Sequence, residues 1–239
     1  MIQPDSELIQ KYNKQGPRYT SYPTAVQFEP ISHTKTWDYL SNELIEPKKL
    51  SLYVHLPFCQ SLCWYCGCTT VISKNPDVSK VYVESLKTEI EKTAQLVHPD
   101  SKVYQLHFGG GTPTFLREQE LVELTETLKK FFVFDENAEI SIEIDPRTVT
   151  QSQVKALAKV GFNRASIGVQ DVNNEVQKAM HRVQSMEQNI QTMEWLRTEG
   201  FESINIDLIY GLPKQTPNLF KNTLDILEFL DPDRIALYS

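Results

Sequence analysis

The sequence contains four cysteines among its 239 residues, and all four lie between Cys59 and Cys68. Cysteines so close together cannot join distant segments, which excludes the disulfide framework of a small secreted protein and favours a reducing compartment. Residues 1–15 lack the apolar core of a signal peptide, and no later run approaches the roughly 20 apolar residues of a membrane span. We therefore expect a cytoplasmic protein that does not associate with a membrane.

Positive charge is also scarce, because 24 Lys and Arg residues face 31 Asp and Glu residues and leave a net charge of -7. This balance argues against a broad surface for nucleic acid. The length and the hydrophobic content of 40% suit one sizeable domain. We expect a monomer whose partner is a small molecule.

Short apolar runs alternate with segments of helical periodicity along the chain. The runs are 52–56, 103–108, 139–144, 164–169, 203–209 and 234–238. Apolar residues at helical spacing between them are Val78, Tyr82, Leu86 and Ile90, then Leu121, Leu124 and Leu128, then Ile190, Met193 and Leu196, then Phe220, Leu224 and Leu227. This alternation predicts an α/β fold with a parallel sheet. We favour a partial (β/α)6 TIM-like barrel over an open, doubly wound sheet, although periodicity alone does not decide between them.

The boundaries of the expected elements carry their own signals. Thr150, with Gln153 three residues later, predicts the start of a helix, and Gly161 and Gly200 lie where helices should end. Residues 1–50 form an irregular amino-terminal arm in this interpretation, and residues 51–239 form the barrel. Because the last strand ends the chain with no helix to cover it, we expect the natural protein to continue.

The segment HLPFCQSLCWYCGC follows the first expected strand, at the strand end where barrel enzymes build their sites. Cys59, Cys63 and Cys66 are separated by three and two intervening residues, a spacing that lets one loop wrap an iron-sulfur cubane. Three ligands leave the fourth iron open to a small molecule. Cys68 is either the fourth ligand or a neighbouring thiol.

Three other interpretations of the cysteines are open. Structural zinc usually takes two cysteine pairs in separate segments, and nothing downstream supplies a second pair. Unliganded cysteines packed as small hydrophobic residues do not suit a loop that carries Trp64 and Tyr65. A non-catalytic electron-transfer module would normally saturate its irons with four cysteines.

Polar residues at the ends of the expected strands predict a ligand site. The second strand ends in HFGGGTPT, whose glycines allow a close approach of backbone to ligand or form a tight turn. In the third strand Ile140, Ile142 and Ile144 alternate with Ser141, Glu143 and Asp145. Glu143, Gln170 and Asp207 can converge on one rim, where each is either a ligand contact or a structural hydrogen-bonding residue.

Other side chains near this rim have less certain roles. Arg182 either faces a carboxylate or is a solvated surface residue. We interpret His55 and His107 as strand-packing histidines, and Tyr53, two residues before His55, faces the same way.

The CxxxCxxC pattern, with Tyr65 directly before its last cysteine, resembles the signature of the radical S-adenosylmethionine (SAM) superfamily. The resemblance implies a 4Fe-4S cluster whose open iron binds SAM and whose electron cleaves it to a 5′-deoxyadenosyl radical. Such a cluster lies toward the low end of the potentials available to iron-sulfur centres.

The segments YNKQGPRYTSYPTA, YVHLPFCQSLCWYCGC, HFGGGTPT, EIDP, GVQD and DLIYGLP occur in this order. Their order resembles that in the family of oxygen-independent coproporphyrinogen III oxidases (dehydrogenases) of haem biosynthesis. The resemblance implies that Cys59, Cys63 and Cys66 hold the cluster. It also implies that Tyr53, Tyr65, Gly110 and Glu143 contact the SAM bound to the cluster, and that Gly111, Thr112, Gln170, Arg182 and Asp207 contact a second SAM.

The implied reaction converts two propionate side chains of coproporphyrinogen III to vinyl groups and yields protoporphyrinogen IX and carbon dioxide. It needs an external electron donor and an external acceptor. Arg18 and Tyr19 either contact the propionates or anchor the arm. A related haem chaperone is the alternative, but it lacks the tyrosine-rich arm. The resemblance also implies a further carboxyl-terminal domain, which we do not expect within residues 1–239.

Overall fold

A computed structural model of the protein describes residues 5–13 and 24–239. The chain divides into two units, Met1–Asn42 and Glu43–Ser239. In the first, α1 (Ser6–Tyr12) begins at Asp5, whose carboxylate accepts hydrogen bonds from the backbone N–H groups of Glu7 and Leu8. A 3-10 helix, η1 (Ala25–Gln27), and α2 (His33–Glu43) follow. No helix of the described residues has both the length and the hydrophobicity needed to cross a membrane. The predicted boundary at residue 50 stays a prediction.

The second unit is built on a six-stranded parallel sheet, in which every predicted strand lies within an observed one. The strands are β1 (Lys49–Leu56), β4 (Lys102–Gly110), β5 (Phe134–Ile144), β6 (Arg164–Gln170), β7 (Ser203–Ile209) and β8 (Arg234–Tyr238). Their spatial order β1-β4-β5-β6-β7-β8 follows the chain. A doubly wound sheet would instead reverse its strand order at a switch point. The order confirms the α/β fold and the partial barrel.

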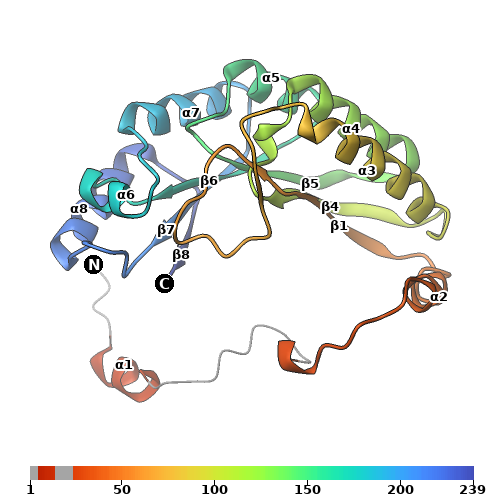
Figure 1. The fold of residues 1–239 in the computed structure, drawn as a ribbon, viewed down its shortest axis with the longest axis horizontal. Helices are drawn as coiled ribbons and strands as arrows, with labels where there is room; N and C mark the ends of the chain where they lie inside the picture. The colour runs from red at the N-terminus through yellow and green to blue at the C-terminus, as the bar shows by residue number, and fades with distance from the viewer. Residues whose placement is uncertain (1–4, 14–23) are drawn as a thin grey trace. The chain divides into compact units, whose positions relative to one another are not determined.

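Helices cover one face of the curved sheet (Figure 1). They are α3 (Val78–Ala94), α4 (Glu118–Phe131), α5 (Gln151–Lys159), α7 (Met186–Thr198) and α8 (Pro217–Leu230). The Thr150 hydroxyl accepts from the Gln153 backbone N–H and the Gln153 side chain accepts in return, as predicted for the start of α5. Gly161 and Gly200, with φ of 96° and 84°, end α5 and α7 as predicted. The short helix α6 (Asn174–Ala179) and the 3-10 helix η2 (Pro113–Phe115) were not predicted.

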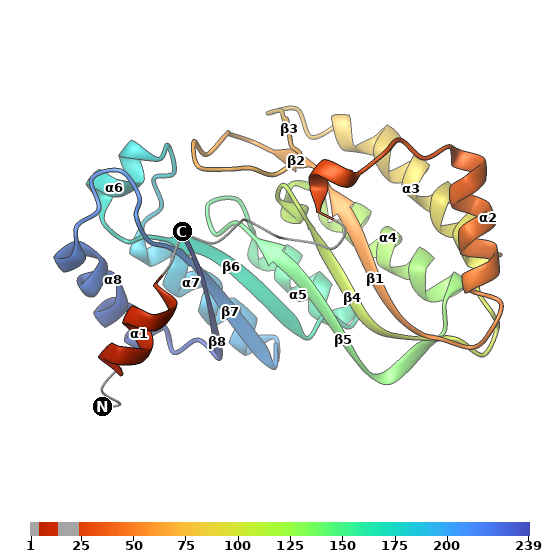
Figure 2. The same cartoon turned by 90° about the horizontal axis from the view of Figure 1, so that it is seen from below.

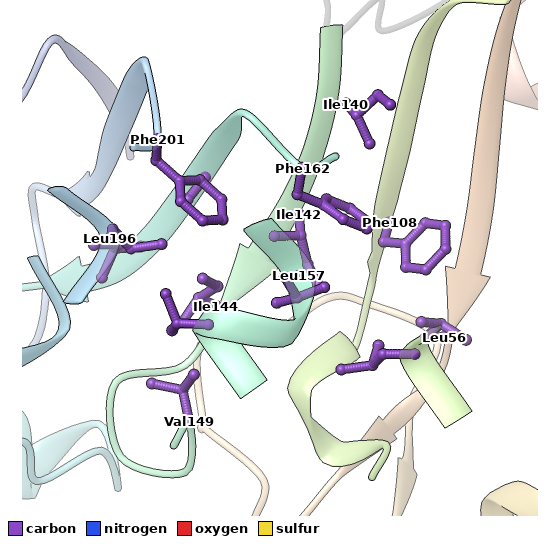
Figure 3. Packing of buried hydrophobic residues seen from close by; sticks show 14 of the residues in the cluster. Leu56, Phe108, Ile140, Ile142, Ile144, Val149, Leu157, Phe162, Leu196 and Phe201 are labelled. Carbon is purple, nitrogen blue, oxygen red and sulfur yellow. The ribbon is translucent and has the colours of Figure 1, made fainter. Parts of the chain in front are cut away.

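The hydrophobic core lies between the sheet and these helices (Figure 3). Ile140, Ile142 and Ile144 of β5 all point into it, and the rings of Phe108 and Phe162 meet edge to face at 5.2 Å. The alternation of β5 therefore places Ser141 and Glu143 on the opposite face, which Figure 2 shows from below. That face carries the polar residues of the strands.

Three helical predictions were wrong in detail. Val78 of α3, Ile190 of α7 and Leu224 of α8 were expected on the apolar helix faces that cover the sheet, but their exposed fractions are 38%, 40% and 43%. In α7 and α8, Asn189 and Thr223 occupy the buried positions beside the last two. Both polar residues are engaged in hydrogen bonds, Asn189 with Gln184 and Thr223 with Asp171, so the buried faces of these helices combine polar residues with apolar ones.

Candidate cluster and cofactor site

The cysteine loop is closed by a small parallel pair of strands, β2 (Phe58–Cys59) and β3 (Val71–Ile72). The backbone N–H of Val71 donates to the Pro57 carbonyl at 2.7 Å, and that of Ser73 donates to the Cys59 carbonyl at 2.9 Å. The loop between them extends across the carboxyl-end edge of the sheet (Figure 2). The sequence did not predict this pair, whose strands are only two residues long.

The far side of the loop is fixed to the segment after α6. The Trp64 backbone N–H donates to the Met180 carbonyl at 3.0 Å, and Nδ1 of His181 lies 2.7 Å from the Leu62 carbonyl oxygen. The rings of Trp64 and His181 stack at 5.3 Å. Tyr65 packs against a small apolar cluster, and burial raises the pKa of its phenol, which is therefore neutral. Contacts at both sides hold the cysteines in place.

The predicted site residues meet at one cavity of about 310 Å³ at this edge of the sheet. Those that line it are Cys59, Cys63, Cys66, Tyr65, Gly110, Gly111, Thr112, Glu143, Gln170, Arg182 and Asp207. Tyr53 lies beside it. Its hydroxyl is 3.0 Å from Nδ1 of His55, and its ring stacks at 5.9 Å on His107, which contacts Glu143 at 3.3 Å. Arg18 and Tyr19 lie outside the described residues.

The cysteines differ in their surroundings. Cys63 is buried, and its sulfur accepts from Nη2 of Arg147 and from Nη1 of Arg182, each at 3.7 Å. The Cys59 thiol donates to Oγ1 of Thr112 at 3.7 Å, and burial raises the pKa of this thiol. Cys68 is exposed but lines the same cavity, so its role stays open.

The donor set fits an iron-sulfur cluster. Within residues 5–13 and 24–239, no group of three or more His, Cys, Asp or Glu side chains is gathered closely enough to hold one metal ion. The thiols of Cys59, Cys63 and Cys66 instead border a cavity. An iron-sulfur cubane is larger than a single metal ion and takes thiolate ligands. Two guanidinium groups lie close enough to the Cys63 sulfur to balance the charge of its thiolate.

The glycine run is required by close packing of strand ends. Gly110 has a φ of 121°, and a Cβ there would lie 2.8 Å from the His55 ring. A Cβ on Gly111 would lie 2.8 Å from the carbonyl oxygens of Pro57 and Phe58. The Gly110 backbone N–H donates to Glu143 at 3.2 Å, which fixes this carboxylate at the cavity. The run therefore serves both structure and site.

Arg147 is a site residue that the sequence analysis missed, and its partner is Asp145, which was predicted on the polar side of the third strand. Arg147 donates through Nε and Nη2 to the carboxylate of Asp145 at 2.9 and 2.6 Å. Arg182 reaches the same carboxylate at 3.2 and 3.3 Å and is only 6% exposed, so its interpretation as a solvated surface residue was wrong. Burial alone would raise the pKa of Asp145, but the two arginines hold it below its ordinary value.

Gln170 ends β6 in an unusual conformation. Its φ is 68°, and the register with β7 is irregular between Gly168 and Gln170. The next residue, Asp171, is fully buried and accepts from Gln215 at 2.6 Å and from Thr223 at 3.3 Å. This carboxylate joins the ends of β6 and β7 to α8, so neighbouring contacts sustain the strained backbone at the cavity.

Asp207 lies on the polar face with Asn205, as predicted. Its oxygens accept from Ser166 at 3.1 Å and from Asn205 at 2.8 Å. Burial, with a smaller contribution from nearby Glu143, raises the pKa of Asp207, while these hydrogen bonds and Arg182 oppose the rise. The ionised form of Asp207 is therefore destabilising in the folded protein.

Replacing Asp207 with asparagine is expected to raise the free energy of unfolding of the cluster-free, full-length protein at neutral pH. The folded pKa of Asp207 is raised, so its penalty is present above that pKa and absent below the unfolded value of about 3.9. The gain should shrink as the pH falls. Urea unfolding at several pH values measures it, with Asp225→Asn as an exposed control; a gain that grew on acidification would contradict the assignment.

Comparison with known proteins gives one consistent result. Residues 53–227 match the radical SAM superfamily. Oxygen-independent coproporphyrinogen III oxidase of Pseudomonas aeruginosa is 46% identical over 98% of this chain and 52% of its own length. The corresponding Escherichia coli protein is 44% identical over 98% of this chain and 51% of its own length. The solved structure of Escherichia coli coproporphyrinogen III oxidase, described as a radical SAM enzyme, covers 99% of this chain with a TM-score of 0.87, at 41% identity and over 52% of that structure. The chain thus spans about half the length of these relatives.

Proposed function

The chain belongs to the radical SAM superfamily, and from this we propose that it is the cluster- and cofactor-binding part of an oxygen-independent coproporphyrinogen III oxidase. The proposed reaction converts two propionate side chains of coproporphyrinogen III to vinyl groups and gives protoporphyrinogen IX. The proposed substrate rests on one observation, which is that 98% of the chain is 43–46% identical in sequence to proteins of that name. The cavity at the cysteines supports the cofactor chemistry.

In this proposal Cys59, Cys63 and Cys66 hold a 4Fe-4S cluster. When bound by these cysteines, the cluster would supply an electron for the cleavage of SAM to methionine and a carbon radical, which could take hydrogen from an unactivated carbon. We assign Tyr53, Tyr65, Gly110 and Glu143 to the first SAM, and Gly111, Thr112, Gln170, Arg182 and Asp207 to a second. Neutral Tyr65 closes one side of the cavity with an apolar body and limits the entry of water.

The charges around the cavity support a zwitterionic ligand. Glu143 and Asp207 provide carboxylates on the strands, and Arg182 provides a guanidinium near Cys63. The α-amino acid group of SAM carries an ammonium and a carboxylate, which match these two kinds of partner. Two propionates require two oxidations, which is the chemical reason for proposing two SAM molecules.

The remaining parts of the proposal concern the whole protein. It is a monomer in the cytoplasm, takes electrons from an external donor and passes electrons from the decarboxylation to an external acceptor. Arg18 and Tyr19, outside the described residues, are proposed to contact the substrate propionates, since carboxylates suit an arginine fork.

The test uses the full-length protein, reconstituted with iron and sulfide without oxygen and then reduced in the presence of SAM. Formation of 5′-deoxyadenosine and methionine is expected, and coproporphyrinogen III added together with an electron acceptor should be converted to protoporphyrinogen IX and carbon dioxide. SAM cleavage without a vinyl product would remove the proposed substrate. A reconstituted cluster that leaves SAM intact would remove the radical chemistry as well.

A further inference from the structure

Two guanidinium groups converge on one cysteine sulfur. Nη2 of Arg147 and Nη1 of Arg182 both lie 3.7 Å from Sγ of Cys63. The side chains of Arg147 and Arg182 are 17% and 8% exposed, so solvent screens their charges weakly. Cys66 has a backbone contact with Cys63, and its side-chain hydrogen bond is with the thiol of Cys68 rather than with a cation. The three thiols of the site are therefore not equivalent.

The charges beside Cys63 do not cancel. Arg147 and Arg182 share one carboxylate, Asp145, so two positive charges and one negative charge leave a net charge of +1. The other donor of Arg182 reaches the neutral Gly168 carbonyl at 2.7 Å, and its Nε has no partner in the described parts of the chain. The uncompensated positive charge thus lies against the sulfur.

The geometry of Arg147 suits a fixed electrostatic role. Asp145 holds its guanidinium through Nε and Nη2, so the group stays oriented toward Cys63. Arg147 lines the proposed SAM cavity and also a second cavity, of about 250 Å³, that Cys59 and Lys74 border. Because it faces the cofactor cavity, its effect on the cluster has to be measured in the absence of SAM.

We propose that Arg147 is a positioning residue that keeps a positive charge on the Cys63 thiolate and thereby raises the redox potential of the cluster. The inference rests on the proposed cluster at Cys59, Cys63 and Cys66. Reduction adds one negative charge to an iron-sulfur cluster, and hydrogen bonds and positive charge at a ligand sulfur stabilise that state. Arg147 therefore makes the cluster easier to reduce.

The experiment is a redox titration of the reconstituted full-length protein, followed by electron paramagnetic resonance in the absence of SAM. In Arg147→Met the reduced-to-oxidised ratio at a fixed potential is expected to fall about tenfold, a shift of ~59 mV to lower potential for one electron. Arg147→Lys keeps the charge and should recover part of the shift. Arg197→Met, which removes a more exposed partner of Asp233, should match the wild type.

An unchanged midpoint potential in Arg147→Met, at wild-type iron and sulfide content, would overturn the inference. If Arg147→Met assembles no cluster, the test uses Arg147→Gln, which is neutral but keeps an N–H donor for Asp145. The midpoint potential of its cluster should also fall. A wild-type potential in this variant would refute the proposed role of Arg147. These outcomes leave SAM cleavage by the wild type untouched. Failure of the wild type to assemble a cluster would instead refute the proposed function.

Discussion

Replacement of Cys63 with serine is expected to prevent cluster assembly in the full-length protein and to lower 5′-deoxyadenosine formation more than ~100-fold. Loss of a partner that merely orients a metal ligand costs about 10- to 100-fold, so loss of a ligand itself should cost more. Cys63 is also buried, and a serine hydroxyl would leave Arg147 and Arg182 facing a neutral group. Iron and sulfide analysis, visible absorbance and nucleoside chromatography measure the loss.

Cys68→Ser is the matched control for this substitution. Cys68 is exposed and two residues beyond Cys66, and its replacement should leave the iron content near that of the wild type. A full cluster in Cys63→Ser would show that this thiol is not a ligand. Loss of the cluster in Cys68→Ser would make Cys68 the fourth ligand and remove the open iron on which SAM binding depends.

Much of the fold was predictable because the inner strands of the sheet, β4 to β7, each have one buried, apolar face. Ile140, Ile142 and Ile144 mark β5 in the sequence as clearly as in the structure, and Gly161 and Gly200 mark helix ends. Hydrophobicity predicted the burial of Met193, Leu196 and Leu227 in α7 and α8. It did not predict that Thr223 is buried as well, because its hydrogen bond joins it to Asp171, which is far away in the sequence.

The cavity was partly predictable for a related reason. The carboxyl ends of parallel strands meet at one edge, so Glu143, Gln170 and Asp207 were expected together, and all three line the cavity. Arg147 was missed because its role depends on Asp145 turning it back toward Cys63, 84 residues earlier. The only signal for it was an arginine two residues after a carboxylate at a strand end.

Replacing Asp145 with alanine is expected to lower the free energy of unfolding of the cluster-free, full-length protein by about 3–5 kcal/mol. Removing one partner from a buried ion pair leaves an uncompensated charge. Here the buried guanidinium group of Arg182 and the partly buried one of Arg147 would lose the only carboxylate that they contact among the described residues. The Arg147 backbone N–H would also lose its acceptor at 3.0 Å. Urea unfolding followed by circular dichroism measures the change, because the free energy of unfolding falls linearly with the urea concentration and can be extrapolated to zero urea.

Glu139→Ala provides the control for Asp145→Ala. Glu139 pairs with Arg164 at 2.8 Å but is 43% exposed, and pairs of this kind contribute about 0–1 kcal/mol. Adding Arg147→Met to Asp145→Ala separates charge from packing. The double variant has one guanidinium group fewer and therefore less uncompensated positive charge. Its loss in the free energy of unfolding should be smaller than the sum of the losses in the two single variants, by about 0.5–3 kcal/mol. If the free-energy losses of the two single variants simply added, Asp145 would stabilise the protein through its backbone turn alone. The guanidinium charges beside Cys63 would then have to be balanced by another group.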